Sequence, residues 1–368
     1  MSTSTYQLAS LRFSIEGRHT VARAVKNEMA SLQQPVDGPV DIAFRFVDRI
    51  APAPNAVLAG RWALSPDALS ARGDGFEFRI TPTDNALTID VVPDSGLTHN
   101  PLTEAWRRAN DWNYLSRGET VAKNFMYDLF DFVSAWKLSE RDCSYIHAST
   151  LSRDDRAVAL IAWGGIGKTT SLLKLVTEDG WRFLSDDLGL INAQGRVFRT
   201  PRHLQIYAYN LEGQPAIARQ LLHGRNPIDR VNWEWRRRRF GVKKVRRRVS
   251  AESLFGNERV AHSAQLHQAI FLERVKNPTF SVVPISSDDL AERAATILID
   301  ELSSLRDLSV VARSHGQTLH TPDLQTFVER CQRTLSSAFA EVPTAILRIP
   351  ADADPDALAD TLRDHLDL

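Results

Sequence analysis

Residues 157–170 read AVALIAWGGIGKTT, and they carry the strongest indication of the fold in the C-terminal part of the chain. Its first seven residues form a continuous apolar run of the length expected for a strand buried on both faces. Glycines follow at once, and a helical pattern runs from Lys168 to about Glu178. The order strand, glycine loop and helix predicts an α/β arrangement with a phosphate-binding loop.

The glycine loop and the start of the helix contain the residue types that a phosphate site needs. Glycines let backbone N–H groups converge on phosphate oxygens, and a helix N-terminus attracts anions. Lys168 adds a positive charge for the β and γ phosphates, and the Thr169 hydroxyl is a Mg²⁺ ligand of the usual kind. Ala162 stands where the common motif has its first glycine. We predict these nucleotide-binding residues: Gly164, Gly165, Ile166, Gly167, Lys168, Thr169 and Thr170.

An aspartate pair follows the next predicted strand, Trp181 to Leu184. Phosphoryl transfer needs a carboxylate for the metal and often a second one for the acceptor proton. Asp186 lies 18 residues after Lys168, which leaves room for one helix and a returning strand. If the segment is strand-like, Asp186 and Asp187 point to opposite faces and suit two different tasks.

Two further side chains are candidates for the site. His147 lies in the predicted strand Ser144 to Ala148, where a histidine is either a hydrogen-bonded structural residue or part of the catalytic network. Arg199 and Arg202 flank Pro201 just after the aspartate pair. An arginine at this point either neutralises charge on a transferring phosphoryl group or faces solvent.

The three motifs together resemble the C-terminal domain of HPr kinase/phosphorylase, which is similar in fold to phosphoenolpyruvate carboxykinases. The motifs are His147–Ser149, Gly165–Thr170 and Ser185–Asp187, in the family's order and at close to its spacing. The resemblance covers residues 145–201 and extends weakly to the C-terminus. It is closer to the HPr-kinase-like proteins of lasso-peptide-type tailoring systems than to the regulator of sugar uptake.

This resemblance implies an ATP- and Mg²⁺-dependent kinase that transfers the γ-phosphoryl group to a hydroxyl, a serine of a peptide or protein. It implies that Lys168 and the loop amides bind the β-phosphate. Thr169 and Asp187 would hold Mg²⁺, Asp186 would be the base, and His147 would belong to the catalytic network. Two alternatives stay open: a small-metabolite kinase of the same fold, and a non-catalytic ATP-binding regulator or nucleic-acid-binding module.

The chain divides into two predicted domains. Residues 1–140 read as a mixed α+β scaffold or recognition domain, and residues 141–368 as the nucleotide-binding catalytic domain. In the first domain, alternating apolar and polar residues predict a strand at Tyr6 to Glu16. Helical spacing of apolar residues predicts a helix from about Gly118 to Leu138.

The charges balance in total but not along the chain. The sequence has 45 basic and 45 acidic residues, yet nine of the thirteen residues from Arg236 to Arg248 are basic and none is acidic. The other 355 residues therefore carry a net charge of 0 − 9 = −9. Such density is expected to repel itself and to stay out of the core. Three interpretations remain. The segment is a solvated, partly disordered loop, or it docks an acidic peptide or protein substrate or adds charge near the ATP phosphates, or it binds nucleic acid.

The remaining sequence features are those of a reducing, cytoplasmic setting. The two cysteines, Cys143 and Cys331, have no metal-binding spacing and are too few for a disulfide framework. The N-terminus lacks the pattern of a secretory signal. No apolar run approaches the roughly 18 residues that span a bilayer, so we expect no membrane partner. Nothing in the sequence specifies the oligomeric state.

Overall fold

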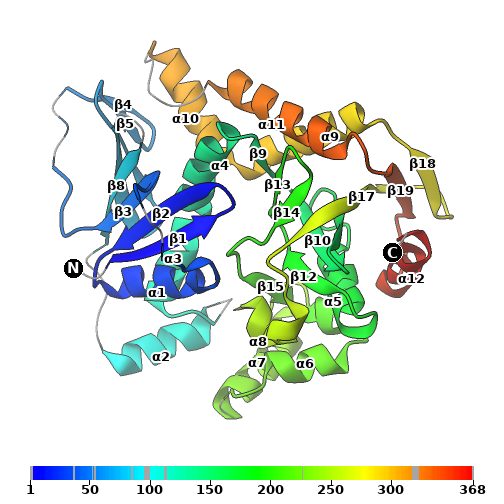
Figure 1. The fold of residues 1–368 in the computed structure, drawn as a ribbon. Coiled ribbons are helices and arrows are strands. Elements are labelled where there is room, and N and C mark those ends of the chain that lie inside the picture. Colours follow the sequence, from blue (N-terminus) through cyan, green and yellow to red (C-terminus); the bar gives the residue numbers. More distant parts are fainter. Residues whose placement is uncertain are drawn as a thin grey trace. The chain divides into compact units, whose positions relative to one another are not determined.

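The computed structural model describes residues 3–35, 38–51, 53, 55–83, 86–94, 100–111, 114–225, 227–316 and 323–366. They form a mixed α/β structure with two compact units (Figure 1). Unit 1 comprises Met1–Arg108, Leu115–Arg141 and Ile299–Arg330, and unit 2 comprises Ala109–Tyr114, Asp142–Leu298 and Cys331–Leu368. Residues 299–330, which the sequence assigned to the C-terminal domain, thus group with unit 1.

Unit 1 is built on an eight-stranded sheet with the order β1-β2-β3-β8-β7-β6-β5-β4. The strands are β1 Thr3–Leu8, β2 Leu11–Glu16, β3 Ile42–Phe46, β4 Val57–Ala59, β5 Trp62–Leu64, β6 Leu69–Gly73, β7 Phe76–Pro82 and β8 Leu87–Pro93. The single strand predicted at Tyr6 to Glu16 is wrong. The chain turns at Ala9, whose φ is 51°, and β1 and β2 pair as an antiparallel hairpin.

The helices of unit 1 pack their aromatic side chains on this sheet. Phe13 of β2 and Phe44 of β3 each lie 5.2 Å, ring centre to ring centre, from a helical partner, Phe130 and Phe125 respectively. The predicted helix 118–138 is confirmed, with a π-helical turn in its middle. The helical segments are α1 Thr20–Glu28, η1 Ala30–Leu32, α2 Pro101–Asn110, α3 Arg117–Phe125, η2 Met126–Phe130, α4 Asp131–Ser139 and α10 Ser303–Ser314. None of these segments carries one of the predicted site residues.

Unit 2 contains a nine-stranded sheet whose main path runs β12-β10-β11-β17-β14-β13-β9. Strand β19 pairs with β17 and with β18 at one side. The strands are β9 Cys143–Ile146, β10 Ala148–Arg153, β11 Arg156–Ile161, β12 Arg182–Ser185, β13 Gly189–Asn192, β14 Arg196–Phe198, β17 Ser263–Val275, β18 Ser281–Pro284 and β19 Thr344–Pro350. A separate two-stranded sheet joins β15 Leu204–Tyr207 to β16 Arg246–Val249. The apolar run of the phosphate loop is β11, which is parallel to β17 and antiparallel to β10.

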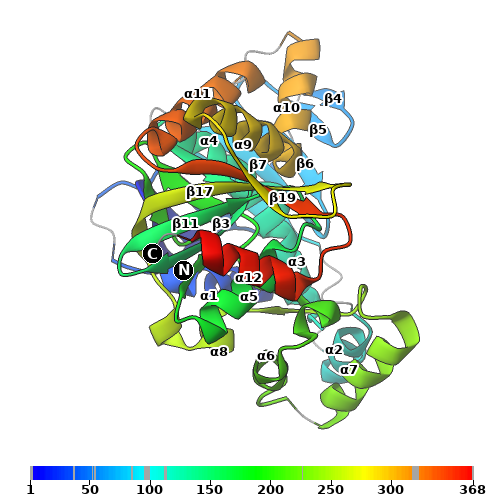
Figure 2. The ribbon, with the colours of Figure 1, turned by 90° about the vertical axis from the view of Figure 1, so that its right-hand side faces the viewer.

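Helices cover both faces of the central strands of this sheet. Helices α5 and α12 lie on one face, and the parts of α9 and α11 that belong to unit 2 lie on the other (Figure 2). Leu172 of α5 and Leu358 of α12 join Ile270 of β17 and Leu347 of β19 in one buried apolar cluster. The helical segments are α5 Lys168–Glu178, η3 Ala208–Leu211, α6 Pro215–Leu221, α7 Pro227–Phe240, α8 Ala251–Phe255, η4 Asn257–Arg259, α9 Ser287–Glu301, α11 Leu324–Phe339 and α12 Pro355–His365. This packing fixes the strand and helix that flank the phosphate loop.

Among the helices that the structure describes, none combines the length and the apolar character needed to cross a bilayer.

Candidate active site

The phosphate loop has the backbone that its glycines predict. Strand β11 ends at Ile161, and α5 begins at Lys168 directly after Gly167, whose φ of 112° lies in the left-handed region. Gly165 also has a positive φ, 78°, and no atom lies within 4 Å of a side chain built there or at Gly164. No described side chain caps the N-terminus of α5. The loop therefore offers open space and uncapped amides to an anion.

The Lys168 side chain is buried and folds back over the loop. Its ammonium donates hydrogen bonds to the carbonyl oxygens of Ala162 at 2.5 Å and Trp163 at 3.0 Å. These carbonyls hold the ammonium at the loop between β11 and α5. A phosphate bound in the loop would offer the ammonium a charged acceptor in place of two neutral ones, which makes a stronger hydrogen bond.

Asp186 is at the centre of a hydrogen-bonded group at the start of α5. Its two carboxylate oxygens accept from the Thr169 hydroxyl at 2.8 Å and the Ser149 hydroxyl at 2.5 Å. Burial raises the pKa of Asp186, and the charge of Asp187 adds to this effect. The hydrogen bonds from Ser149 and Thr169 and the charge of Lys168 act in the opposite direction. The structure thus brings the predicted aspartate to the predicted phosphate loop.

Asp187 does not continue a strand, so the expectation of opposite strand faces is wrong. Strand β12 ends at Ser185, and the Leu188 amide donates to the Asp186 carbonyl at 2.8 Å. This closes a three-residue turn around Asp187, whose φ is 71°. A γ-turn with this sign of φ is the rarer and more strained kind. The turn still separates the two carboxylates, because it gives each aspartate a different set of partners.

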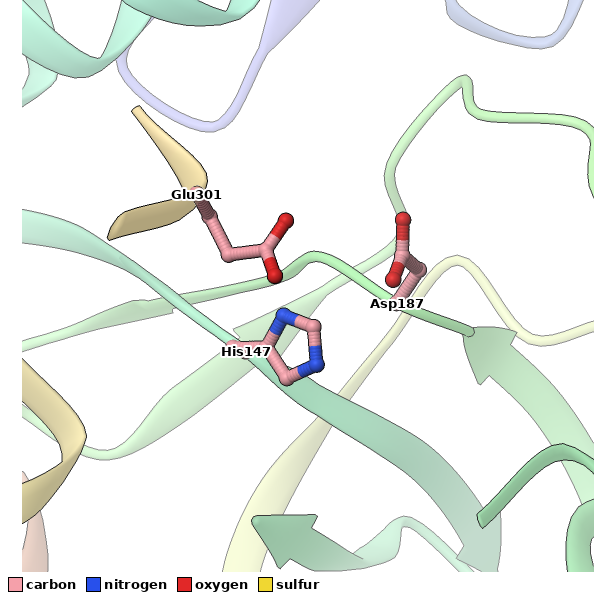
Figure 3. A group of neighbouring side chains, drawn as sticks. All are labelled: His147, Asp187 and Glu301. Carbon is pink, nitrogen blue, oxygen red and sulfur yellow. The ribbon is translucent and has the colours of Figure 1, made fainter. Parts of the chain in front are cut away.

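Asp187 pairs with Arg202 and lies near His147. The buried Arg202 guanidinium donates to the Asp187 carboxylate at 2.5 Å, while about half of the Asp187 side chain stays exposed. His147 is buried between β9 and β10, and one of its ring nitrogens lies within 4.8 Å of an Asp187 carboxylate oxygen. Figure 3 shows the imidazole and the carboxylate facing each other. Glu301, also drawn there, belongs to unit 1.

Two other predicted side chains have partners outside this group. Thr170 is buried, and its hydroxyl accepts from the Asn210 amide at 2.8 Å. Arg199 is buried in an ion pair with Glu252. Burial opposes the ionisation of Glu252, but hydrogen bonds from its own backbone and from Arg199 hold its pKa below the ordinary value. Arg202 and not Arg199 is therefore the arginine beside the aspartate pair.

The structure adds two residues, Ser149 and Asn210, to which the sequence analysis gave no role in the site. Ser149 was part of the quoted histidine motif, and the structure places its hydroxyl on Asp186. Asn210 is buried in the 3₁₀ segment η3, and besides Thr170 it binds the backbone N–H of Tyr207 at 2.9 Å through its side-chain oxygen. The sequence does not indicate a role for Asn210 at the site, because its contact with Thr170 joins segments 40 residues apart.

The basic segment 236–248 is not uniformly exposed, so the expectation that it stays out of the core is wrong in part. Arg236 and Arg247 are 3% and 1% exposed. The Arg247 guanidinium lies 3.8 Å from the centre of the Tyr114 ring and pairs with Asp229 at 3.3 Å. Burial lowers the pKa of Arg247, and the Asp229 charge opposes this effect. Aromatic faces and one carboxylate stabilise these charges inside unit 2.

No protein-family model matches the sequence, and neither does any curated protein. Among solved structures, the chain is similar to the HPr(Ser) kinase/phosphatase from Coxiella burnetii, at 14% sequence identity and a TM-score of 0.28. The match covers 60% of this chain and 95% of that chain. The kinase resemblance therefore continues to rest on the three sequence motifs.

The residues at the loop fit a bound nucleotide with its divalent cation. Mg²⁺ prefers oxygen ligands, and the Thr169 hydroxyl and Asp186 carboxylate lie together at the first turn of α5. Lys168 and the uncapped amides of this turn suit phosphate oxygens. The Asp187 carboxylate is partly exposed, pairs with Arg202 and lies near His147.

Proposed function

We propose that this protein is a kinase that uses ATP and Mg²⁺ to transfer the γ-phosphoryl group to a hydroxyl, a serine of a peptide or protein. The observation that carries the proposal is the hydrogen bond between Thr169 and Asp186. It joins the helix of the phosphate loop to the aspartate pair. A carboxylate next to the loop threonine is the arrangement that holds Mg²⁺ in phosphate-loop proteins.

The contacts favour a division of work between the two aspartates that differs from the one the resemblance implies. We propose Asp186, next to Thr169, as the carboxylate that holds Mg²⁺. Asp187 is then the base that accepts the proton of the acceptor hydroxyl, because its carboxylate is half exposed and can be reached by a substrate. Arg202 would hold the Asp187 carboxylate in place through the ion pair at 2.5 Å. Mg²⁺, when bound, would neutralise charge on the phosphates during transfer.

The test compares Asp186→Asn with Asp187→Asn, using labelled ATP, candidate serine peptides and separate nucleotide-binding measurements. Asp186→Asn should abolish the gain in ATP affinity that Mg²⁺ produces. Asp187→Asn should bind Mg²⁺–ATP normally and lose transfer by about a hundredfold or more. Normal transfer by Asp187→Asn would exclude it as the base. ATP binding with no transfer to any acceptor would instead favour the non-catalytic regulator.

A further inference from the structure

Helix α7 has an apolar stripe that faces solvent. Ile228, Val231 and Trp235 are 79%, 69% and 57% exposed. Their spacing of three and four residues places them on one side of the helix, over about 10 Å of its length. Three large apolar side chains exposed in line are unusual for a surface that meets only water.

The opposite side of α7 is fixed to unit 2. Trp233 is buried against Tyr114, with ring centres 6.0 Å apart. Arg236 donates to the carbonyl oxygen of Asp111 at 2.6 Å, and Asn232 donates to that of Ala109 at 2.9 Å. The helix is thus held by one face while its apolar stripe points outward, so the stripe is a fixed and pre-formed surface.

The exposed part of the basic segment continues this surface. Arg238 and Arg239 follow Trp235 by three and four residues, so they lie on the same side of the helix one turn further on. Lys243 and Lys244 come just after the helix end, and all four side chains are exposed. Together they extend the stripe with a positively charged end.

We propose that this α7 surface, the apolar stripe with its basic end, binds an acidic segment of a partner polypeptide in which apolar residues stand next to carboxylates. Burial of the three apolar side chains would supply affinity, and charge complementarity at the basic end would set the orientation. The inference goes beyond the proposed function, because binding at α7 requires no phosphoryl transfer.

The order of the residues along α7 favours a polypeptide over other anionic partners. A helix that lies on a membrane carries basic residues beside its apolar face along most of its length. On α7 four of the five arginines lie in the last five residues, and Arg230 is the exception. Glu234 lies beside the stripe in ion pairs with Arg237 and Arg238. Nucleic acids bind through aromatic stacking and phosphate contacts, to which Ile228 and Val231 contribute nothing.

The test measures binding of fluorescent synthetic peptides to the full chain without nucleotide. The main probe carries leucine and valine followed by a run of glutamate. A second probe replaces glutamate with lysine, and a third replaces the apolar residues with serine. We expect the main probe to bind at least about tenfold more tightly than either of the others. Equal binding of all three probes would overturn the proposal.

Variants locate the binding surface. Ile228→Ser with Val231→Ser should remove the advantage of the apolar probe, and Arg238→Glu with Arg239→Glu should remove the preference for glutamate. Lys276→Glu, an exposed charge reversal outside α7, should leave both preferences intact. If the α7 variants bind like the wild type, the proposal fails.

Two further measurements separate the proposal from its rivals and from the proposed function. Binding of phosphatidylcholine–phosphatidylserine vesicles or of single-stranded DNA that is stronger than peptide binding and is lost in the α7 variants would overturn the proposal. Lys168→Ala should bind the main probe as the wild type does. A failure of the kinase assay therefore leaves the α7 result standing, and a failure at α7 leaves the kinase assay unaffected.

Discussion

Lys168 is the charged side chain of the phosphate loop, residues 162–170. Its ammonium already lies on the carbonyl oxygens of Ala162 and Trp163, so a nucleotide can replace these acceptors without unfolding the loop. We expect Lys168→Ala to weaken ATP binding by about tenfold or more, because it removes a charge-assisted hydrogen bond of about 1.5–3 kcal/mol. Titration calorimetry with ATP measures the loss. Lys276→Ala is the control, and equal affinities for the two variants would contradict the role of Lys168.

Asp186 makes the stability of the apoprotein depend on pH. Because burial raises its pKa, the folded state binds the Asp186 proton more tightly than the unfolded state does. Stability from this group is present at low pH and is lost as pH rises from the ordinary carboxyl range through the raised pKa. We expect Asp186→Asn, without Mg²⁺, to raise Tm by about 2 °C at about pH 7.5, and the gain to vanish at about pH 3.

Asp187→Asn is the matched control for this measurement. It makes the same chemical change one residue away, but it removes the carboxylate that pairs with the buried Arg202. Removing the negative charge beside that buried guanidinium should lower Tm instead of raising it. Thermal scans of the two variants over the same pH series should therefore move in opposite directions at neutral pH. Tm shifts of the same sign in both variants would mean that burial of the Asp186 carboxylate does not cause the rise in Tm.

The sequence predicts the position of the loop residues better than it predicts the contacts of the two aspartates. The glycines and Lys168 follow a buried strand directly, and glycine readily adopts the positive φ angles seen at Gly165 and Gly167. One contact of Asp186 is with Ser149, 37 residues away. The contacts of Asp187 depend on a tight turn, which the sequence does not distinguish from the continuation of strand β12. Such contacts are set by the pairing of β10 with β12, which no local pattern reveals.

The prediction that the run of basic residues stays out of the core is wrong in part for a related reason. Dense positive charge favours exposure unless the fold supplies partners, and here Tyr114 is more than a hundred positions earlier in the chain. The same run contributes the end of α7, a short connection and strand β16, so its side chains alternate between solvent and core. The apolar run before the phosphate loop is different, because apolar side chains favour burial whatever packs against them. The prediction of a strand there is confirmed by β11.

The buried arginine gives this element its own prediction. Arg247→Ala should destabilise the protein by about 3 kcal/mol, because it removes a buried guanidinium that stacks on Tyr114 and pairs with Asp229. Urea unfolding measures the change. Arg238→Ala, in the same basic segment but 78% exposed, should change stability by less than about 0.5 kcal/mol. Equal effects would mean that the aromatic environment does not stabilise Arg247.

The zero net charge of the protein results from a basic segment, residues 236–248, and an acidic remainder that cancel each other. The chain has no net charge, and its isoelectric point is about 7.2. The basic segment nevertheless keeps several cations exposed close together, among them Arg237, Arg238, Lys243 and Lys244. A field of this kind attracts polyanions even when the total charge is zero. The affinity of the protein for negatively charged surfaces should therefore depend on where its exposed cations lie and not on its net charge.

Ion-exchange chromatography near the isoelectric point tests this statement. We expect the wild type to be retained on a sulfonated or heparin resin at low salt, because local attraction is screened only weakly there. A variant with serine at four exposed cations of the basic segment should elute earlier; the positions are Arg237, Arg238, Lys243 and Lys244. A control variant with serine at four scattered exposed cations loses the same charge; the positions are Arg18, Arg49, Lys276 and Arg313. The control should elute close to the wild type, and equal shifts for both variants would show that only the total charge matters.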